Sequence, residues 1–253
     1  MITDKSNEAK PLMTGSDIKA YLQQLLAQCQ SSFEASLDAS NLPKVAASHL
    51  FANEIVKWSG VLGDRRESEL LKVAASEYEL GLLSLTQGHY RQSFKALRLV
   101  LELILQAVYL SANELCLREW LDNRIDTIWS SIVDPEQGVF SHRFAKAFFT
   151  DLSRHVSHYR GLAGSVYREC SECVHGNTPK QVPLQACLGF DQEVFDLWHG
   201  KASHVALISH FALSLRYLRD LPEVDVCVLE PFLADHLGHL EEIRQYLGGP
   251  TKG

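Results

Sequence analysis

Arg168 and His175 are the two residues whose types and spacing best suit a chemical reaction. They are seven positions apart, close to two turns of an α-helix, so both side chains are predicted to project from one helix face. Gly176 follows His175, with Pro179 and Pro183 beyond it, so the helix is predicted to end at His175. There the negative end of the helix dipole favours a protonated imidazole. A permanently charged guanidinium beside a proton-donating imidazole is suited to acting on a phosphodiester.

The pair lies in a basic, histidine-rich window of an acidic chain. The 253 residues carry a formal charge of −7, whereas residues 142–175 contain five Lys or Arg side chains and four histidines. Residues 220–242 contain seven carboxylates and neither Lys nor Arg. This asymmetry fits either a local anion-binding site or two separately solvated faces. In the first case, the candidate contacts to RNA or phosphate are Arg154, His155, His158 and Arg160.

A zinc site is one alternative interpretation of the cysteines beside the pair. Cys170, Cys173 and His175 have the spacing of half such a site. A further donor would have to come from Cys187, His199 or His204. The chain has no second CxxC, and in a helix Cys170 and Cys173 lie next to the Arg–His stripe rather than in a knuckle. We therefore favour thiols that bind no metal.

Asp151, His155 and His158 form a second group that a metal would suit, because their i, i+4, i+7 spacing places them on one helix face. The same spacing is also typical of a solvated polar face, which we favour. The chain lacks a P-loop, a Rossmann glycine pattern, Gly-x-Ser-x-Gly and HExxH. We therefore predict neither a metal nor any other cofactor.

Hydrophobic periodicity predicts an all-α protein, a helical bundle with an N-terminal helical extension. Long helices are expected near residues 16–38, 43–60, 67–86, 90–112, 155–175, 191–218 and 228–247, and shorter ones near 113–134 and 141–152. Helix 90–112 is the most apolar and is expected at the centre of the bundle. The predicted organisation is a disordered segment 1–14, the extension 15–64 and the bundle 65–253.

The chain shows the composition of a cytoplasmic protein. Its N-terminus lacks the apolar run of a signal peptide, and its most hydrophobic segment, residues 97–110, is interrupted by polar residues and too short to cross a bilayer. Six scattered cysteines show no disulfide framework. We therefore predict reduced thiols, no membrane association and a cytoplasmic location.

The segment Tyr167-Arg168-Glu169-Cys170-Ser171-Glu172-Cys173-Val174-His175-Gly176 resembles the Arg-x4–6-His motif of the HEPN superfamily. A second segment, residues 88–102, resembles the early helix of HEPN bundles, where small and apolar residues precede an Arg…Glu pair. The resemblance covers about residues 66–247. It implies an all-α homodimer and, as in many members, a metal-independent ribonuclease with the motif lining the dimer cleft.

The resemblance also implies roles for individual residues. His175 would be the general acid or base at the ribose 2′-hydroxyl or the leaving oxygen, and Arg168 would stabilise charge on the phosphate. Ser171 and Glu172 would position the phosphate or hold the arginine, and Asn177 would support the same site. The pattern departs from the family after the arginine, where Glu169 replaces a small polar residue.

Glu102 has two interpretations. It would orient Arg168 across the bundle, or it would pair with Arg98 four residues earlier on its own helix, which we favour because such pairs are common. The leading functional hypothesis is an endoribonuclease that acts on RNA, as a bacterial toxin or antiviral phage-defence effector. The alternative is a non-catalytic helical subunit that binds a protein partner, a role that the acidic balance and Glu169 favour. In either case a separate partner or inhibitor would fit the family.

Overall fold

The computed structural model describes residues 15–175 and 188–250, with the backbone alone for residues 174 and 175. Eleven α-helices and two short 3-10 helices, and no strand, occur in these ranges. The long helices are α1 (Gly15–Ser36), α2 (Leu42–Leu62), α3 (Ser68–Thr86), α4 (Tyr90–Ser111), α8 (Val156–His175) and α9 (Gln192–Tyr217). The shorter ones are α5 (Glu114–Leu121), α6 (Trp129–Ile132), α7 (His142–Phe148), η1 (Thr150–Arg154), η2 (Leu218–Asp220), α10 (Glu223–Leu237) and α11 (Glu241–Tyr246).

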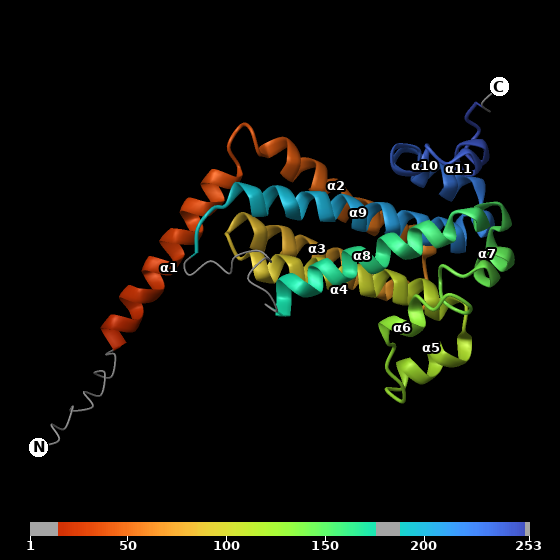
Figure 1. Ribbon diagram of the computed structural model, residues 1–253, viewed down its shortest axis with the longest axis horizontal. Helices are drawn as coiled ribbons and strands as arrows, with labels where there is room; N and C mark the ends of the chain where they lie inside the picture. Colours follow the sequence, from red (N-terminus) through yellow and green to blue (C-terminus); the bar gives the residue numbers. More distant parts are fainter. Residues whose placement is uncertain (1–14, 176–187, 251–253) are drawn as a thin grey trace, which may run out of the picture.

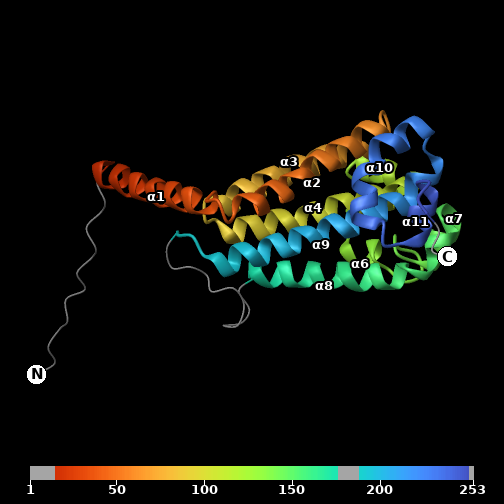
Figure 2. The same cartoon turned by 90° about the horizontal axis from the view of Figure 1, so that it is seen from above.

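Five long helices, α2, α3, α4, α8 and α9, lie side by side along the long axis of the bundle (Figures 1 and 2). The centre is α4, as its apolar periodicity predicts. Leu97, Leu101, Ile104, Leu105 and Val108 are all fully buried there. The prediction of an all-α helical bundle is confirmed.

The two ends of the bundle differ. Helices α5, α6, α7, α10 and α11 gather at one end, whereas α1 projects as an arm from the other (Figures 1 and 2). α8 runs toward the end from which α1 projects and reaches His175 there. The candidate catalytic pair therefore lies near the end of the bundle that the small helices leave uncovered.

The expected extension, residues 15–64, consists of two helices with different surroundings. α2 packs against α3, α9 and α10 and contributes Phe51, Ile55 and Trp58 to the core. Only α1 projects, and it carries no large buried side chain. By its packing, α2 is therefore part of the bundle. The expected disordered segment 1–14 lies outside the described residues.

The single terminal helix expected over 228–247 is wrong, because the structure has α10 and α11 instead. α10 begins directly after Pro222, with Glu223 and Asp225 in its first turn, where carboxylates favour a helix start. The chain then turns at Gly238, where an added Cβ would lie 2.3 Å from the carbonyl oxygen of Ala234. Such a close approach of the backbone requires glycine.

None of the helices within residues 15–175 and 188–250 combines the length and apolarity that crossing a membrane requires.

Candidate functional site on helix α8

Helix α8 presents one face to the core and the other to solvent. Val156, Tyr159, Ala163, Val166 and Cys170 are buried against α4 and α9. This spacing of three and four residues is the apolar stripe expected of a helix on the surface of a bundle. Trp129 of α6 also stacks on Tyr167, whereas the side of α8 that carries Arg168 is exposed and is available to a ligand or partner.

Arg168 lies on the solvent face of α8. Its side chain is exposed, and it makes no hydrogen bond or ion pair with any described residue, including Glu172. On the same face, one and two turns earlier, an added Cβ at Gly164 or Gly161 would meet nothing within 4 Å. The α-helical backbone continues to His175, about 10 Å further along the axis and on the same side of the helix. The guanidinium is therefore open to solvent where the sequence places it.

Two of the predicted site residues lie partly or wholly outside the described residues. The structure gives the backbone of His175 as the last residue of α8, and it does not describe Asn177. Their predicted roles stay predictions.

Glu169, the departure from the family pattern, is directed to α9. Its carboxylate forms an ion pair with Lys201 and accepts a hydrogen bond from Ser165 Oγ at 2.9 Å. Burial opposes ionisation, but these two hydrogen bonds, together with the positive charges of Lys201 and Arg168, outweigh it and lower the pKa of Glu169. The negative charge beside Arg168 is therefore compensated within the bundle.

Glu102 pairs with Arg98, so the favoured interpretation of this residue is confirmed. Arg98 Nη2 lies 3.2 Å from Glu102 Oε1 and donates to the Tyr167 hydroxyl at 2.5 Å. The guanidinium also lies 4.5 Å from the centre of the Tyr167 ring, which stacks on Trp129. Glu102 makes no described contact with Arg168. It therefore helps to fix the residue before the arginine instead of the arginine itself.

The other supporting residues have contacts within α8 or none. Ser171 Oγ donates to the carbonyl oxygen of Tyr167 at 2.7 Å, which occupies its hydroxyl hydrogen. Glu172 is half-buried and has no hydrogen bond or ion pair with a described residue. Of the two, Glu172 is the one whose polar group is available for the role predicted from the resemblance.

The zinc alternative receives little support from the described side chains. Cys170 is 1% exposed, and burial raises the pKa of its thiol to about 12. Among the described residues, neither Cys170 nor Cys173 belongs to a group of three ligand atoms close enough to hold one metal ion. His199, one of the possible further donors, contacts Ser48 on α2 instead. Cys187 and the side chain of His175 lie outside the described residues.

The basic residues at the start of α8 are held by the acidic end of the chain. Arg154 Nε lies 2.6 Å from Glu242 Oε1, and His155 Nε2 lies 3.1 Å from the same atom. His158 is exposed and Arg160 is half-buried, and neither has an ion pair with a described residue. These four candidate RNA contacts lie toward the end of α8 that is about 30 Å from His175. The structure does not bring them together with the Arg–His pair.

The expected metal face of Asp151, His155 and His158 is interrupted. Asp151 belongs to the 3-10 helix η1 and pairs with Arg219, while His155 pairs with Glu242 and α8 begins at Val156. The three side chains therefore have different neighbours and no shared helix face.

No family of known proteins, no curated protein and no solved structure matches this chain.

A pocket that the sequence did not predict lies between α2 and α9. It has a volume of about 530 Å³. Its polar walls come from Lys44 and Ser48 on α2 and from Asp196 and His199 on α9, and Tyr78 of α3 also lines it. On each helix the pocket residues recur at the spacing of one helix face, and this spacing can be recognised in the sequence. The pairing of helices some 150 positions apart is not visible in one sequence.

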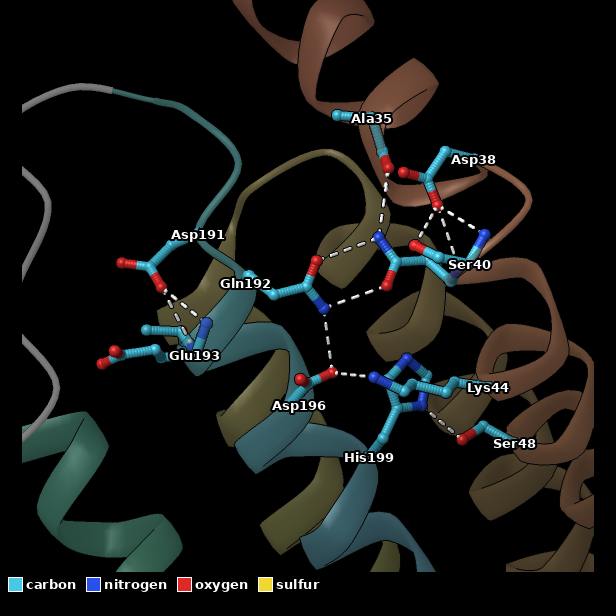
Figure 3. A network of polar contacts seen from close by, with 12 residues as sticks. Ala35, Asp38, Ser40, Lys44, Ser48, Asp191, Gln192, Glu193, Asp196 and His199 are labelled. Carbon is cyan, nitrogen blue, oxygen red and sulfur yellow. Dashed lines mark hydrogen bonds and ion pairs between the residues drawn. The ribbon is translucent and has the colours of Figure 1, made fainter.

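The polar contacts at the mouth of this pocket tie α2 to α9 (Figure 3). Lys44 Nζ lies 2.5 Å from Asp196 Oδ1, and Ser48 Oγ lies 2.6 Å from His199 Nδ1. Nearby, the amides of Asn41 and Gln192 exchange hydrogen bonds of 2.9 and 3.2 Å. The two helices are thus held at a fixed separation, with space between them.

Two buried polar atoms of the pocket residues lack partners, Tyr78 Oη and His199 Nε2. Burial raises the pKa of Tyr78 far above its ordinary value, and the nearby Ser48 hydroxyl offsets only part of this increase. The Tyr78 and Ser48 hydroxyls do not form a hydrogen bond of regular geometry. Burial also lowers the pKa of His199 to about 4, so its imidazole is neutral at pH 7. An unsatisfied buried polar atom costs about 1–3 kcal/mol of stability.

The depressed pKa of His199 predicts a loss of stability in mild acid. The unfolded chain takes up this proton near pH 6.5 and the folded chain only near pH 4. The free energy of unfolding therefore keeps its full value above pH 6.5 and decreases by on the order of 3 kcal/mol as the pH falls to 4. In chemical denaturation between pH 8 and 4, the free energy of unfolding should decrease less for His199→Gln than for the wild type. Equal slopes would contradict the assignment.

Glu54, His210 and His236 form a buried cluster at the other end of this region. Their ligating atoms lie within 4.8 Å of one another, which is close enough for one metal ion. Trp58 Nε1 donates to His210 Nδ1 at 3.2 Å, so the ring proton of His210 is on Nε2, which donates to Glu54 Oε2 at 2.8 Å. A metal on Nε2 would move that proton to Nδ1, against the indole N–H. The geometry therefore favours a hydrogen-bonded cluster over a metal site.

Proposed function

We propose that this chain is a HEPN-like endoribonuclease that cleaves RNA without a metal, with Arg168 and His175 as its catalytic pair. The observation that carries the proposal is the state of Arg168, which is exposed, unpaired among the described residues and on the His175 side of α8. The charge of Glu169 is meanwhile taken up by Lys201. Arg168 thus remains available to a phosphate as a cationic group, with the Glu172 carboxylate one turn further along α8.

The reaction that suits this pair is attack of the ribose 2′-hydroxyl on the adjacent phosphorus. The 2′-oxygen forms a bond to phosphorus, and the bond from phosphorus to the 5′-oxygen breaks. The proton of the 2′-hydroxyl is removed and the 5′-oxygen is protonated, so the products are a 2′,3′-cyclic phosphate and a 5′-hydroxyl. His175 serves one of these proton transfers, and Arg168 stabilises the charge that develops on the phosphate oxygens.

A second copy of the chain is part of the proposal. Gly161 and Gly164 carry no side chain, and an added Cβ at either would meet nothing within 4 Å, so another chain has room to approach Arg168. Two such faces together would form a cleft with an arginine and a histidine from each copy. A cellular role as a toxin or phage-defence effector, acting in the cytoplasm, follows from the resemblance.

Arg168→Ala is the direct test of the site. We expect the wild type to cleave single-stranded RNA in the presence of EDTA and Arg168→Ala to do so about 10²–10³-fold more slowly, as when one transition-state donor is removed. The thermal stability should change little, because the exposed Arg168 side chain makes no hydrogen bond or ion pair with a described residue. The cyclic phosphate product is measured on a labelled RNA.

Arg118→Ala is the matched control, since this exposed arginine on α5 has only a surface pair with Glu114. Its rate should equal that of the wild type. If the wild type cleaves no RNA under these conditions, or if Arg168→Ala is as active, the second candidate gains. That candidate is a non-catalytic subunit that uses the same exposed face of α8 to bind a protein.

A further inference from the structure

Helix α1 carries a stripe of residues that the bundle covers only in part. Its members recur at alternating spacings of four and three residues, the pattern by which one helix packs along another. They are Ile18, Leu22, Leu25, Cys29, Ser32 and Ser36. Tyr21 and Leu26 flank the stripe and widen its apolar part. One face of α1 is therefore built for contact with other helices along its whole length.

The C-terminal half of the stripe packs on the chain's own bundle. Ser32 and Ser36 are 2% and 0% exposed. Cys29 Sγ lies 3.4 Å from Nε2 of His89, the residue before α4. An added Cβ at Gly88 would lie 3.1 Å from Ser32 Oγ. The turn between α3 and α4 thus covers the stripe from about Cys29 onward.

The N-terminal half of the stripe has no such cover among the described residues. Every residue from Gly15 to Gln24 is exposed, and α1 projects from the bundle there (Figures 1 and 2). Ile18, Leu22 and Leu26 are 47%, 57% and 68% exposed. A short helix that stands alone in water is only marginally stable, because packing of an apolar face supplies most of its stability. The arm therefore calls for a second surface.

The charge and length of the free half define what covers it. Asp17 and Lys19 are the only charged residues between Gly15 and Phe33, so the stripe suits a helix that is neutral as well as apolar. Since the α3–α4 turn occupies the stripe from Cys29 onward, the covering helix must end there. The α1 arm of a second copy meets both requirements if the two arms run antiparallel. In a parallel pair, the second arm would continue into the space of that turn.

From these observations we infer that α1 is a dimerisation arm that pairs antiparallel with α1 of a second copy of this chain. In the register that places the free residues opposite one another, Leu22 faces Leu25 of the second copy and Ile18 faces its Cys29. The same residues serve on both copies, as a twofold dimer requires. The inference depends neither on RNA cleavage nor on a contact between two α8 faces.

The available area is that of a modest interface. Ile18, Tyr21, Leu22 and Leu26 are each about half exposed or more. Two arms together would therefore cover on the order of 800 Å² of apolar side chain, before the neighbouring glutamines are counted. Specific interfaces bury about 1,000 Å² or more. We expect reversible pairing with a Kd below about 100 µM.

The mass of the full chain in solution, measured by light scattering over a dilution series, is the first test. At about 500 µM, five times the expected upper limit of Kd, the wild type should be well above the 28.4 kDa of one chain. Leu22→Gln/Leu26→Gln keeps good helix formers and should raise the Kd at least about tenfold. Leu50→Gln/Leu80→Gln, at two leucines that are 58% exposed on α2 and α3, is the control and should associate like the wild type.

An interchain disulfide tests the register. Ile18→Cys places a thiol opposite the native Cys29 of the second copy, and oxidised glutathione, which accepts the two electrons, should convert the two thiols into a disulfide. Within one chain these positions are about 16 Å apart along the helix, too far to join. Ala20→Cys lies on the opposite side of α1 and should link much less. Ile18→Cys/Cys29→Ser should lose the link.

The inference is overturned if the wild type stays a single chain at about 500 µM, the result expected where a different protein covers the arm. It is also overturned if the arm variant associates as tightly as the wild type, because the contact then lies elsewhere. A third contrary result is an Ile18→Cys variant that links to Cys29 no more than Ala20→Cys does. Since these measurements contain no RNA, they are separate from a failure of the proposed nuclease activity.

Discussion

His175→Ala is expected to lower the rate of RNA cleavage by about 10²–10⁴-fold, the contribution typical of a positioned general acid or base. The residue ends α8, where the helix dipole favours the protonated imidazole, and Arg168 stands two turns earlier on the same side. The wild-type rate should depend on pH with the titration of an imidazole, and the residual rate of the variant should lose that dependence. EDTA should not change the activity of either protein.

His49→Ala is the control for this loss. His49 is an exposed histidine of α2 and makes no hydrogen bond with a described residue. Its variant should keep the rate and pH profile of the wild type. If His175→Ala retains the wild-type rate, or if chelation alone removes the activity, a metal-independent mechanism through His175 is wrong.

The helices were predictable because each is encoded locally. The apolar residues of α4 recur every three or four positions, and Pro43, Gly63 and Gly88 mark helix boundaries that a sequence displays. The terminal segment shows the limit of this approach. The turn at Gly238 follows from the path of the backbone past Ala234, and a single glycine in a periodic pattern does not reveal it.

The site was predictable only in part, because its charges are balanced over long sequence separations. The spacing of Arg168 and His175 is local and visible. The compensation of Glu169 by Lys201 joins residues 32 positions apart, and that of Arg154 by Glu242 joins residues in different thirds of the chain. These pairs decide which charges remain free. The sequence shows a basic window, whereas the packed helices leave only part of it unpaired.

The same reasoning explains why the α2/α9 pocket was not predicted. The sequence places His199 and His210 in one predicted helix, residues 191–218. It did not show that His199 meets Ser48, or that His210 meets Glu54, because both partners come from α2. The partners of buried polar residues depend on helix packing, which one sequence does not specify.

His210→Leu is expected to destabilise the protein by about 3–5 kcal/mol, as when one partner of a buried pair is removed. His210 is fully buried, and burial lowers the pKa of its imidazole, so it is a neutral donor to Glu54 and an acceptor from Trp58. The leucine would leave a buried carboxylate and a buried indole N–H without this partner. For a chain of this length the melting temperature should fall by roughly 10 °C.

The pH dependence of that loss distinguishes a charge effect from a packing effect. Hydrogen bonds from His210 and His236 outweigh burial and lower the pKa of Glu54 to about 2, so its contribution is present above pH 4.5 and is lost as the pH falls toward 2. In His210→Leu the carboxyl is buried with one donor fewer, so its pKa should rise and protonation should relieve the cost. The stability difference should therefore narrow as the pH falls through 4.5. His236 lies at the partly exposed edge of the cluster, so His236→Leu should lower the free energy of unfolding less than His210→Leu does at pH 7. The double variant Glu54→Leu/His210→Leu should be more stable than His210→Leu alone, because no unpaired carboxylate remains. A difference that is constant with pH would mean that lost packing, and not the buried carboxylate, causes the destabilisation.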